Sequence, residues 1–148
     1  MRVSKDTYFM GIAKAVSKRS PCLNRQVGCV LLDKNNHIMS TGYNGPPSGV
    51  VHCTQCRRSK PGRDLYLCEA VHAEMNALLQ CRNTNEIVSA FITINPCMIC
   101  ARLLANTSCE YIYVGGIYTK ESMAQFIDFW QMGLQRKVID LSMGSLEK

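Results

Sequence analysis

The second half of the chain alternates helical and strand patterns, and this alternation limits the folds that it can adopt. Helical spacing of apolar residues predicts helices over residues 71–82, 97–106 and 121–132, and short apolar runs predict strands over 89–95, 110–116 and 136–140. In the first of these helices Met75, Leu78 and Leu79 share a face, and Gly133 is the expected C-cap of the last. Strands that alternate with helices build a sheet that helices cover on both faces. We therefore expect an α/β fold with a mixed sheet.

The first half adds a helix, a strand hairpin and a long irregular segment. Residues 4–20 carry apolar side chains at helical spacing, and Ser4 stands where an N-cap is expected. Residues 26–33 and 37–44 are typical of two strands, which the turn "KNNH" joins into a hairpin. Residues 45–67 are rich in Gly, Pro, Cys and Arg without clear periodicity, and such a stretch within a compact domain is usually functional.

Composition indicates an intracellular protein with a hydrophobic core. Of the 148 residues, 47% are hydrophobic, which suffices for one core, so we expect a single domain over residues 1–148. No apolar run approaches the ~20 residues of a membrane helix, and the N-terminus lacks the apolar segment of a secretory signal. We therefore expect a cytoplasmic protein without a membrane partner. Its nine cysteines, an odd number, favour metal binding over a disulfide framework.

Two short motifs place metal ligands at the starts of two predicted helices. "NPCMIC" sets Cys97 and Cys100 three residues apart, so that their sulfurs point the same way. The positive end of the helix dipole favours thiolates, the form that binds zinc. "VHAEMN" puts His72 in the first turn of another helix. Helix starts gather at the carboxyl ends of strands, so the three side chains can form a zinc site with one open position, as in catalytic zinc sites.

Glu74 follows two residues after this histidine. It is placed off the metal but beside the open position, where its carboxylate can take a proton from activated water and pass it on. H-x-E with P-C-x-x-C is the pattern of zinc-dependent base deaminases. Either motif alone has an ordinary explanation, as a polar residue at a helix start or as a redox or structural cysteine pair. Both together, each opening a helix with one strand between them, favour a catalytic zinc site with Glu74 as its catalytic residue.

At these motifs the chain resembles the zinc-dependent cytidine deaminase superfamily, and within it the deoxycytidylate (dCMP) deaminases. The resemblance covers nearly the whole chain and rests on "SPCLNRQVGCVLL", "STGYNGPPSG", "CEAVHAEMNALL" and "INPCMICARLL". It implies a three-layer α/β/α cytidine-deaminase-like fold with a five-stranded mixed sheet. It also implies a hydrolase that acts on the cyclic amidine C–N bond of dCMP, releasing ammonia and supplying dUMP for thymidylate synthesis.

The resemblance assigns roles around the substrate as well. Glu74 protonates N3 of the cytosine during attack at C4 and then helps ammonia leave. Asn24 matches a position that lines the substrate site, and Tyr118 matches a tyrosine that contacts nucleotide, although an exposed loop tyrosine is the alternative. Arg25 and Lys120 are our candidates for contact with the substrate phosphate, because a phosphate accepts charge-assisted hydrogen bonds.

Four further cysteines, Cys22, Cys53, Cys56 and Cys68, lie in stretches typical of loops. A closed, structural zinc among them would tie the long irregular segment to the start of the first strand. The resemblance supports this expectation, because several dCMP deaminases carry such a zinc and Cys22 and Cys53 fall at matching positions. Cys68, Cys56 and His52, in that order, compete for the two remaining places, and reduced free thiols are the alternative.

The stretch "GYNGPPSG", residues 42–49, predicts a rigid turn whose exposed backbone N–H groups suit a phosphate. Asn44 and Gly45 lie in it, and Arg57 and Arg58 follow on the same loop. The resemblance implies that this region binds a triphosphate effector at the subunit contacts of a homo-oligomer, often a hexamer. We expect activation by dCTP with Mg²⁺ and inhibition by dTTP, and the alternative is a tight turn with solvated arginines.

Two other functions fit parts of the sequence. A tRNA adenosine deaminase uses the same zinc chemistry on a flipped base, and the formal net charge of +6 suits nucleic acid as well as a small phosphate ester. The basic residues of the long loop form no stripe with interleaved aromatics, however, so we do not expect a nucleic-acid partner. A non-catalytic nucleotide-binding module that keeps zinc for structure would not need Glu74.

Overall fold

The computed structural model describes residues 1–58 and 67–142, and its helices and strands follow the predicted order. The helices are α1 (Lys5–Ser17), α2 (Ala73–Gln80), α3 (Met98–Ala105) and α4 (Lys120–Gln131), with a short 3-10 helix, η2 (Thr84–Glu86), before the third strand. The strands are β1 (Gly28–Leu32), β2 (Ile38–Tyr43), β3 (Ser89–Ile92), β4 (Tyr111–Val114) and β5 (Lys137–Asp140). Within the described ranges, no helix is long and apolar enough to cross a membrane.

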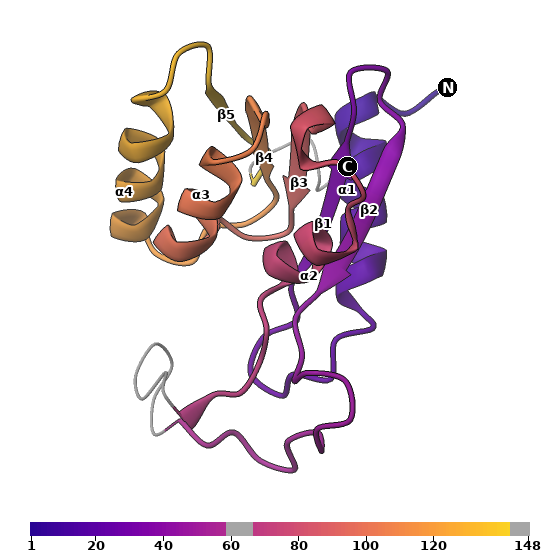
Figure 1. Ribbon diagram of the computed structural model, residues 1–148, viewed down its shortest axis with the longest axis vertical. Coiled ribbons are helices and arrows are strands. Elements are labelled where there is room, and N and C mark those ends of the chain that lie inside the picture. The colour runs from indigo at the N-terminus through magenta and orange to yellow at the C-terminus, as the bar shows by residue number, and fades with distance from the viewer. Residues whose placement is uncertain (59–66, 143–148) are drawn as a thin grey trace.

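The strands form one mixed sheet in the order β2-β1-β3-β4-β5 (Figure 1). β1 lies antiparallel to both β2 and β3, whereas β3, β4 and β5 are parallel to one another. The carboxyl ends of β2, β3, β4 and β5 therefore meet the amino end of β1 at one edge of the sheet. We call this edge the site edge, because α2, α3 and α4 begin there and the loop segments 18–27 and 44–58 lie there.

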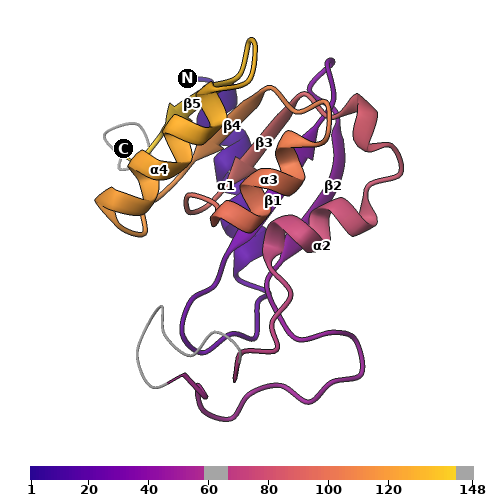
Figure 2. The ribbon, with the colours of Figure 1, turned by 60° about the vertical axis from the view of Figure 1, so that its left-hand side comes forward.

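Helices cover both faces of the sheet (Figures 1 and 2). α1 covers one face, where Phe9 and Met10 belong to a buried apolar cluster. α2, α3 and α4 cover the other face over a larger cluster that includes Leu104, Phe126 and Trp130. The two clusters on opposite sides of one sheet confirm the expected three-layer α/β/α fold.

Two glycines let helices approach this sheet closely. A Cβ at Gly28 would collide with the α1 backbone at Ala13, and a Cβ at Gly42 would collide with the α2 backbone at Ala73 and Ala77. Glycine at these two strand positions therefore brings helix backbone against strand backbone. This contact sets how near α1 and α2 lie to the sheet.

The close approach of α2 changes which of its residues are buried. The sequence predicts an apolar face of Met75, Leu78 and Leu79, but Leu79 is 79% exposed and that part of the prediction is wrong. Ala73 and Ala77, which are small enough to lie against Gly42, form the buried side of α2 instead.

The ends of the helices differ from prediction by one or two residues. Ser4 is the N-cap of α1 as predicted, since its side chain accepts a hydrogen bond from the Thr7 N–H at 3.1 Å. α2 begins at Ala73, two residues later than predicted. α4 has Met132 as its C-cap where the sequence favours Gly133, and Gly133 is not among the glycines with positive φ. The end of α4 therefore does not use the conformational freedom of glycine.

Candidate active site

The site edge brings together His72, Cys97 and Cys100. His72 is the N-cap of α2, Cys97 is the N-cap of α3, and Cys100 lies in the first turn of α3. The Nδ1 atom of His72 lies 3.5 Å from Sγ of Cys97 and 3.3 Å from Sγ of Cys100. All three potential ligand atoms lie within 4.8 Å of one another. We call these three residues the His72 cluster.

The backbone at the two helix starts explains this convergence. Both N-cap residues are extended, with φ −69 and ψ 155 at His72 and φ −69 and ψ 166 at Cys97. The His72 ring makes no capping hydrogen bond to α2, so it can face the sulfurs. Sγ of Cys97 accepts a hydrogen bond from the Cys100 N–H at 3.4 Å, which holds this sulfur over the start of α3.

Electrostatics within the cluster favour a thiolate at Cys97. Hydrogen bonds from the Cys100 side chain and from His72 lower the pKa of Cys97 to about 4, against the effect of burial. The hydrogen bond between Cys100 and Cys97 raises the pKa of the Cys100 thiol. The hydrogen bond between His72 and Cys97 raises the pKa of the His72 imidazole. One imidazole and two cysteine sulfurs are ligands that zinc prefers, and three protein ligands are typical of catalytic zinc. The residues of the His72 cluster therefore fit a zinc ion.

Glu74 lies in the first turn of α2 and is only 4% exposed. Burial raises the pKa of its carboxyl to about 7, although its own backbone amide and the Cys100 thiol oppose this shift through hydrogen bonds. A buried carboxyl group is costly for a folded chain, so it needs a physical reason. With a pKa near neutrality, Glu74 can both accept and donate a proton, which is the requirement for general acid–base catalysis.

Two predicted substrate residues meet at the site edge. The guanidinium carbon of Arg25 lies 4.3 Å from the centroid of the Tyr118 ring, which is cation–π stacking. Tyr118 remains 40% exposed. Asn24 and Lys120 are also exposed, and Asn24 borders a loop cavity together with Cys22. The structure thus brings Arg25 into contact with Tyr118. Asn24, which precedes Arg25, and Lys120, two residues after Tyr118, remain exposed.

Asn95, which no sequence motif singles out, connects Tyr118 with the segment that carries Cys97. It is 6% exposed and stands two residues before Cys97. Its Oδ1 atom accepts a hydrogen bond from the Tyr118 N–H at 2.7 Å. The only signal for it in the sequence is a polar residue between a buried strand and Pro96.

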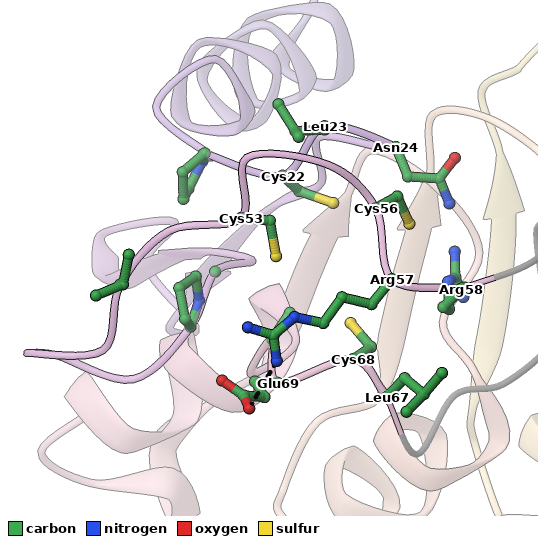
Figure 3. Close-up of a pocket in the computed structure, with 15 residues that line it drawn as sticks. Cys22, Leu23, Asn24, Cys53, Cys56, Arg57, Arg58, Leu67, Cys68 and Glu69 are labelled. Carbon is green, nitrogen blue, oxygen red and sulfur yellow. Dashed lines mark hydrogen bonds and ion pairs between the residues drawn. The ribbon is translucent and has the colours of Figure 1, made fainter.

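The four loop cysteines line one small cavity (Figure 3). Cys22, Cys53, Cys56 and Cys68 border a space of about 50 Å³, and Figure 3 shows their sulfur atoms directed into it. His52 is not among the described residues that line the cavity. Among residues 1–58 and 67–142, the His72 cluster is the one group of three or more such side chains placed closely enough to hold a metal ion, and the loop cysteines do not form such a group.

The predicted effector residues Asn44 and Gly45 have partners within the chain. The Asn44 side chain accepts a hydrogen bond from the Val27 N–H at 2.8 Å and donates one to the Arg25 carbonyl at 2.9 Å. Gly45 and Val71 exchange backbone hydrogen bonds in an isolated bridge. These contacts give both residues a structural role, and their effector role stays a prediction.

The two predicted effector arginines lie by the cysteine cavity. Arg57 forms an ion pair with Glu69 at 3.1 Å, and both side chains are more than half exposed. Arg57 and Arg58 also border the cavity (Figure 3). Exposed pairs of this kind contribute little to stability, so Arg57 can exchange partners at small cost.

A mixed sheet with a His/Cys/Cys cluster and a buried glutamate at its helix starts defines the class of zinc-dependent base deaminases. Comparison with protein families agrees with this class. The chain belongs to the family described as "Cytidine and deoxycytidylate deaminase zinc-binding region", whose model matches residues 3–116.

Individual relatives are named deoxycytidylate deaminases. The chain is 39% identical over 127 residues to the deoxycytidylate deaminase of Mycobacterium phage D29, covering 79% of this chain and 95% of that protein. It is 35% identical over 129 residues to the deoxycytidylate deaminase of Schizosaccharomyces pombe, covering 82% of this chain but 40% of the longer yeast protein. The crystal structure of dCMP deaminase from the cyanophage S-TIM5 in complex with dCMP and dUMP has a TM-score of 0.75 and 26% identity, covering 95% of this chain and 98% of that one.

Proposed function

We propose that the protein hydrolyses dCMP to dUMP and ammonia and so supplies dUMP for thymidylate synthesis. The observation that carries this proposal is the buried Glu74 beside the His72 cluster, a constellation that a purely structural metal site would not need. The names of the phage and yeast relatives support dCMP as the substrate, as does the cyanophage complex with dCMP and dUMP. The cysteines point to a reducing compartment, and we place the protein in the cytoplasm.

Within this proposal the residues of the cluster have separate tasks. His72, Cys97 and Cys100 hold zinc, which supplies Lewis-acid activation of water at neutral pH. Glu74 accepts a proton from the attacking water and delivers it to N3 of the cytosine. It then takes the remaining proton of the hydroxyl now bound to C4 and gives it to the C4 amino group, so that the C4–N bond breaks, the C4=O bond forms and ammonia leaves. Its burial limits access of solvent protons and keeps the carboxyl at a pKa suited to both directions of transfer.

Four residues at the site edge bind the rest of the nucleotide in this proposal. Tyr118 and Asn24 contact the nucleotide, and Arg25 and Lys120 contact its 5′-phosphate. The stacking of Arg25 on Tyr118 supports a joint role, because it fixes a cation beside an exposed aromatic ring. A phosphate accepts charge-assisted hydrogen bonds that a nucleoside cannot offer, so the chain should prefer dCMP over deoxycytidine.

An ammonia-release assay tests the proposed substrate. dCMP, CMP, deoxycytidine and dCTP are supplied in turn to the zinc-loaded protein, and kcat/KM is measured for each. We expect dCMP to exceed deoxycytidine by at least ~100-fold, about the value of two charge-assisted hydrogen bonds. Equal kcat/KM for dCMP and deoxycytidine would contradict the proposed phosphate contacts. Absence of ammonia release from all four compounds would contradict the proposed activity.

A second, structural zinc among Cys22, Cys53, Cys56 and Cys68 is part of the proposal. The shared cavity and the inward direction of the four sulfurs support it (Figure 3). The position of His52 outside the lining favours Cys56 and Cys68 as the last two ligands. A closed four-cysteine site would hold the loop segment 53–58 against the entry to β1.

The proposal also includes regulation, with dCTP and Mg²⁺ as the activator and dTTP as the inhibitor. By resemblance, it further includes assembly into a homo-oligomer, a hexamer. Support comes from the exposed Arg57 and from Arg58, which line the same cavity as Gly45 of the turn and can bind a triphosphate. The contacts of Asn44 within the chain weigh against a direct role for that residue.

A further inference from the structure

Asn95 occupies the junction between the metal-binding helix and the loop that carries Tyr118. It follows β3 and precedes Pro96 and Cys97, so it belongs to the segment from which α3 begins. Its backbone N–H donates to the Gly116 carbonyl at 3.0 Å. With an exposed fraction of 6%, its side chain has exchanged water for contacts within the protein.

Both polar ends of the Asn95 side chain are used. Oδ1 accepts from the Tyr118 N–H at 2.7 Å, and Nδ2 donates to Oγ of Ser122 at 3.1 Å. Ser122 itself forms a reciprocal capping box with Thr119 at the start of α4. One buried amide thus fixes the main chain at Tyr118 and the start of α4 relative to the segment that carries Cys97.

The other partner of Tyr118 is held at its backbone too. The Arg25 carbonyl accepts from the Asn44 side chain at 2.9 Å, and the Arg25 N–H donates to Sγ of Cys22 at 3.5 Å. The Arg25–Tyr118 stack therefore joins two anchored main-chain segments. If Tyr118 lost its anchor, the stack would lose the geometry that an approaching nucleotide meets.

We propose that Asn95 is a positioning residue for substrate binding, which acts through Tyr118 by holding its main chain next to the metal-binding helix. The inference rests on the proposed function, since it takes Tyr118 as a contact of dCMP. A buried asparagine that only stabilised the fold would need partners, but those partners would have no reason to be a substrate-facing residue and the start of the adjacent helix. Asn95 itself does not touch the reacting atoms.

The test is a double-mutant cycle between Asn95→Leu and Tyr118→Ala, measured with the zinc-loaded protein and dCMP. Asn95→Leu keeps the number and branching of side-chain heavy atoms but removes both side-chain hydrogen bonds, so KM should rise about tenfold while kcat changes less than about threefold. Tyr118→Ala should raise KM at least as much. The double variant should resemble Tyr118→Ala alone, because two changes that act through one contact are not additive.

Further variants separate positioning from general damage. Asn95→Asp keeps an acceptor for the Tyr118 N–H. The Ser122 hydroxyl, which now donates to the Thr119 carbonyl, can turn to donate to the second carboxylate oxygen, so the KM of this variant should lie nearer to that of the wild type than the KM of Asn95→Leu. Asn35→Leu, in the exposed turn at the opposite edge of the sheet, should leave KM and kcat unchanged. Zinc content should stay the same in all variants.

The outcomes are distinguishable from those of the proposed function. Additive KM changes in the cycle, or a fall in kcat alone for Asn95→Leu, would overturn the inference while wild-type turnover of dCMP stands. If Asn95→Leu does not fold, an unchanged KM in Tyr118→Ala would overturn it equally. Failure of the wild-type protein to release ammonia from dCMP would instead remove the function on which the inference depends.

Discussion

The protein carries two groups of candidate metal ligands, the His72 cluster and the four loop cysteines, and they differ in the structure that positions them. The His72 cluster stands on helix starts that pack on the sheet, and its ligand atoms lie within 4.8 Å of one another. The loop cysteines lie outside the described helices and strands, and Cys53, Cys56 and Cys68 are exposed. A rigid scaffold arranges ligands in advance for chemistry, whereas ligands on a loop must use metal binding to arrange the loop. The first group should therefore govern activity and the second stability.

The largest expected effect comes from removing a ligand of the first group. Cys97→Ser should abolish activity while the protein still folds, because the packing of α3 through the buried Ala101 and Leu104 does not depend on the Cys97 sulfur. Cys81→Ser, a thiol at the end of α2 outside both groups, is the matched control and should keep nearly full turnover. Circular dichroism and ammonia release measure both variants, and full activity of Cys97→Ser would contradict the catalytic zinc.

Loss of the proton carrier should cost less than loss of a ligand. Glu74→Gln keeps the shape of the side chain but cannot exchange a proton, so turnover should fall by at least ~100-fold, the low end for general acid–base catalysis. Zinc content and thermal unfolding should match those of the wild type. Near-normal turnover in this variant would exclude Glu74 from the mechanism.

The second group should show the opposite pattern. Cys53→Ser should lower the zinc content from two ions to one per chain and lower the free energy of unfolding by about 2 kcal/mol, or roughly 4–8 °C in Tm, with kcat largely retained. His52→Ser should change neither quantity, since His52 lies outside the lining of the cavity. Elemental analysis that finds one zinc in the wild-type chain would refute the second site and with it the contrast between the two groups.

The smallest expected effect concerns the effectors. dCTP with Mg²⁺ should raise the initial rate at low dCMP, and dTTP should lower it, by a few-fold each, because a ligand shifts an equilibrium only by its differential affinity for the two states. Rates are compared in the wild type and in Arg58→Ala. Overlapping hyperbolic curves under all three conditions would show an unregulated enzyme and leave the turn at residues 42–49 with a structural role.

Local signals in the sequence suffice for most of the fold. The order of elements, the N-cap at Ser4 and the family are confirmed, because strand and helix periods and short ligand motifs are properties of neighbouring residues. The exposed position of Leu79 was not predicted, since the buried side of α2 depends on Gly42, more than thirty residues away, lying against Ala73 and Ala77. The hydrophobic pattern of α2 alone does not reveal this contact, so it does not show that Leu79 lies on the exposed side of the helix.

The candidate site shows the same difference between local signals and contacts of distant residues. H-A-E and P-C-x-x-C predict which residues meet, because each motif opens a helix and helix starts share one sheet edge. Asn95 was not predicted, since its role comes from a hydrogen bond to Tyr118, 23 positions away. The contacts of Asn44 with residues 25 and 27 are likewise invisible in the turn motif that suggested an effector site.

The close contact at Gly42 has a consequence for mutational tolerance. Any side chain there would push α2 off the sheet, and His72 and Glu74 would move with it while Cys97 and Cys100, on α3, stayed in place. Selection for turnover should therefore reject substitutions at Gly42 more strictly than selection for a folded, abundant protein. A strand residue outside the His72 cluster thus sets the alignment between its histidine and its cysteines, and attempts to redesign this enzyme should treat Gly42 as part of the proposed site.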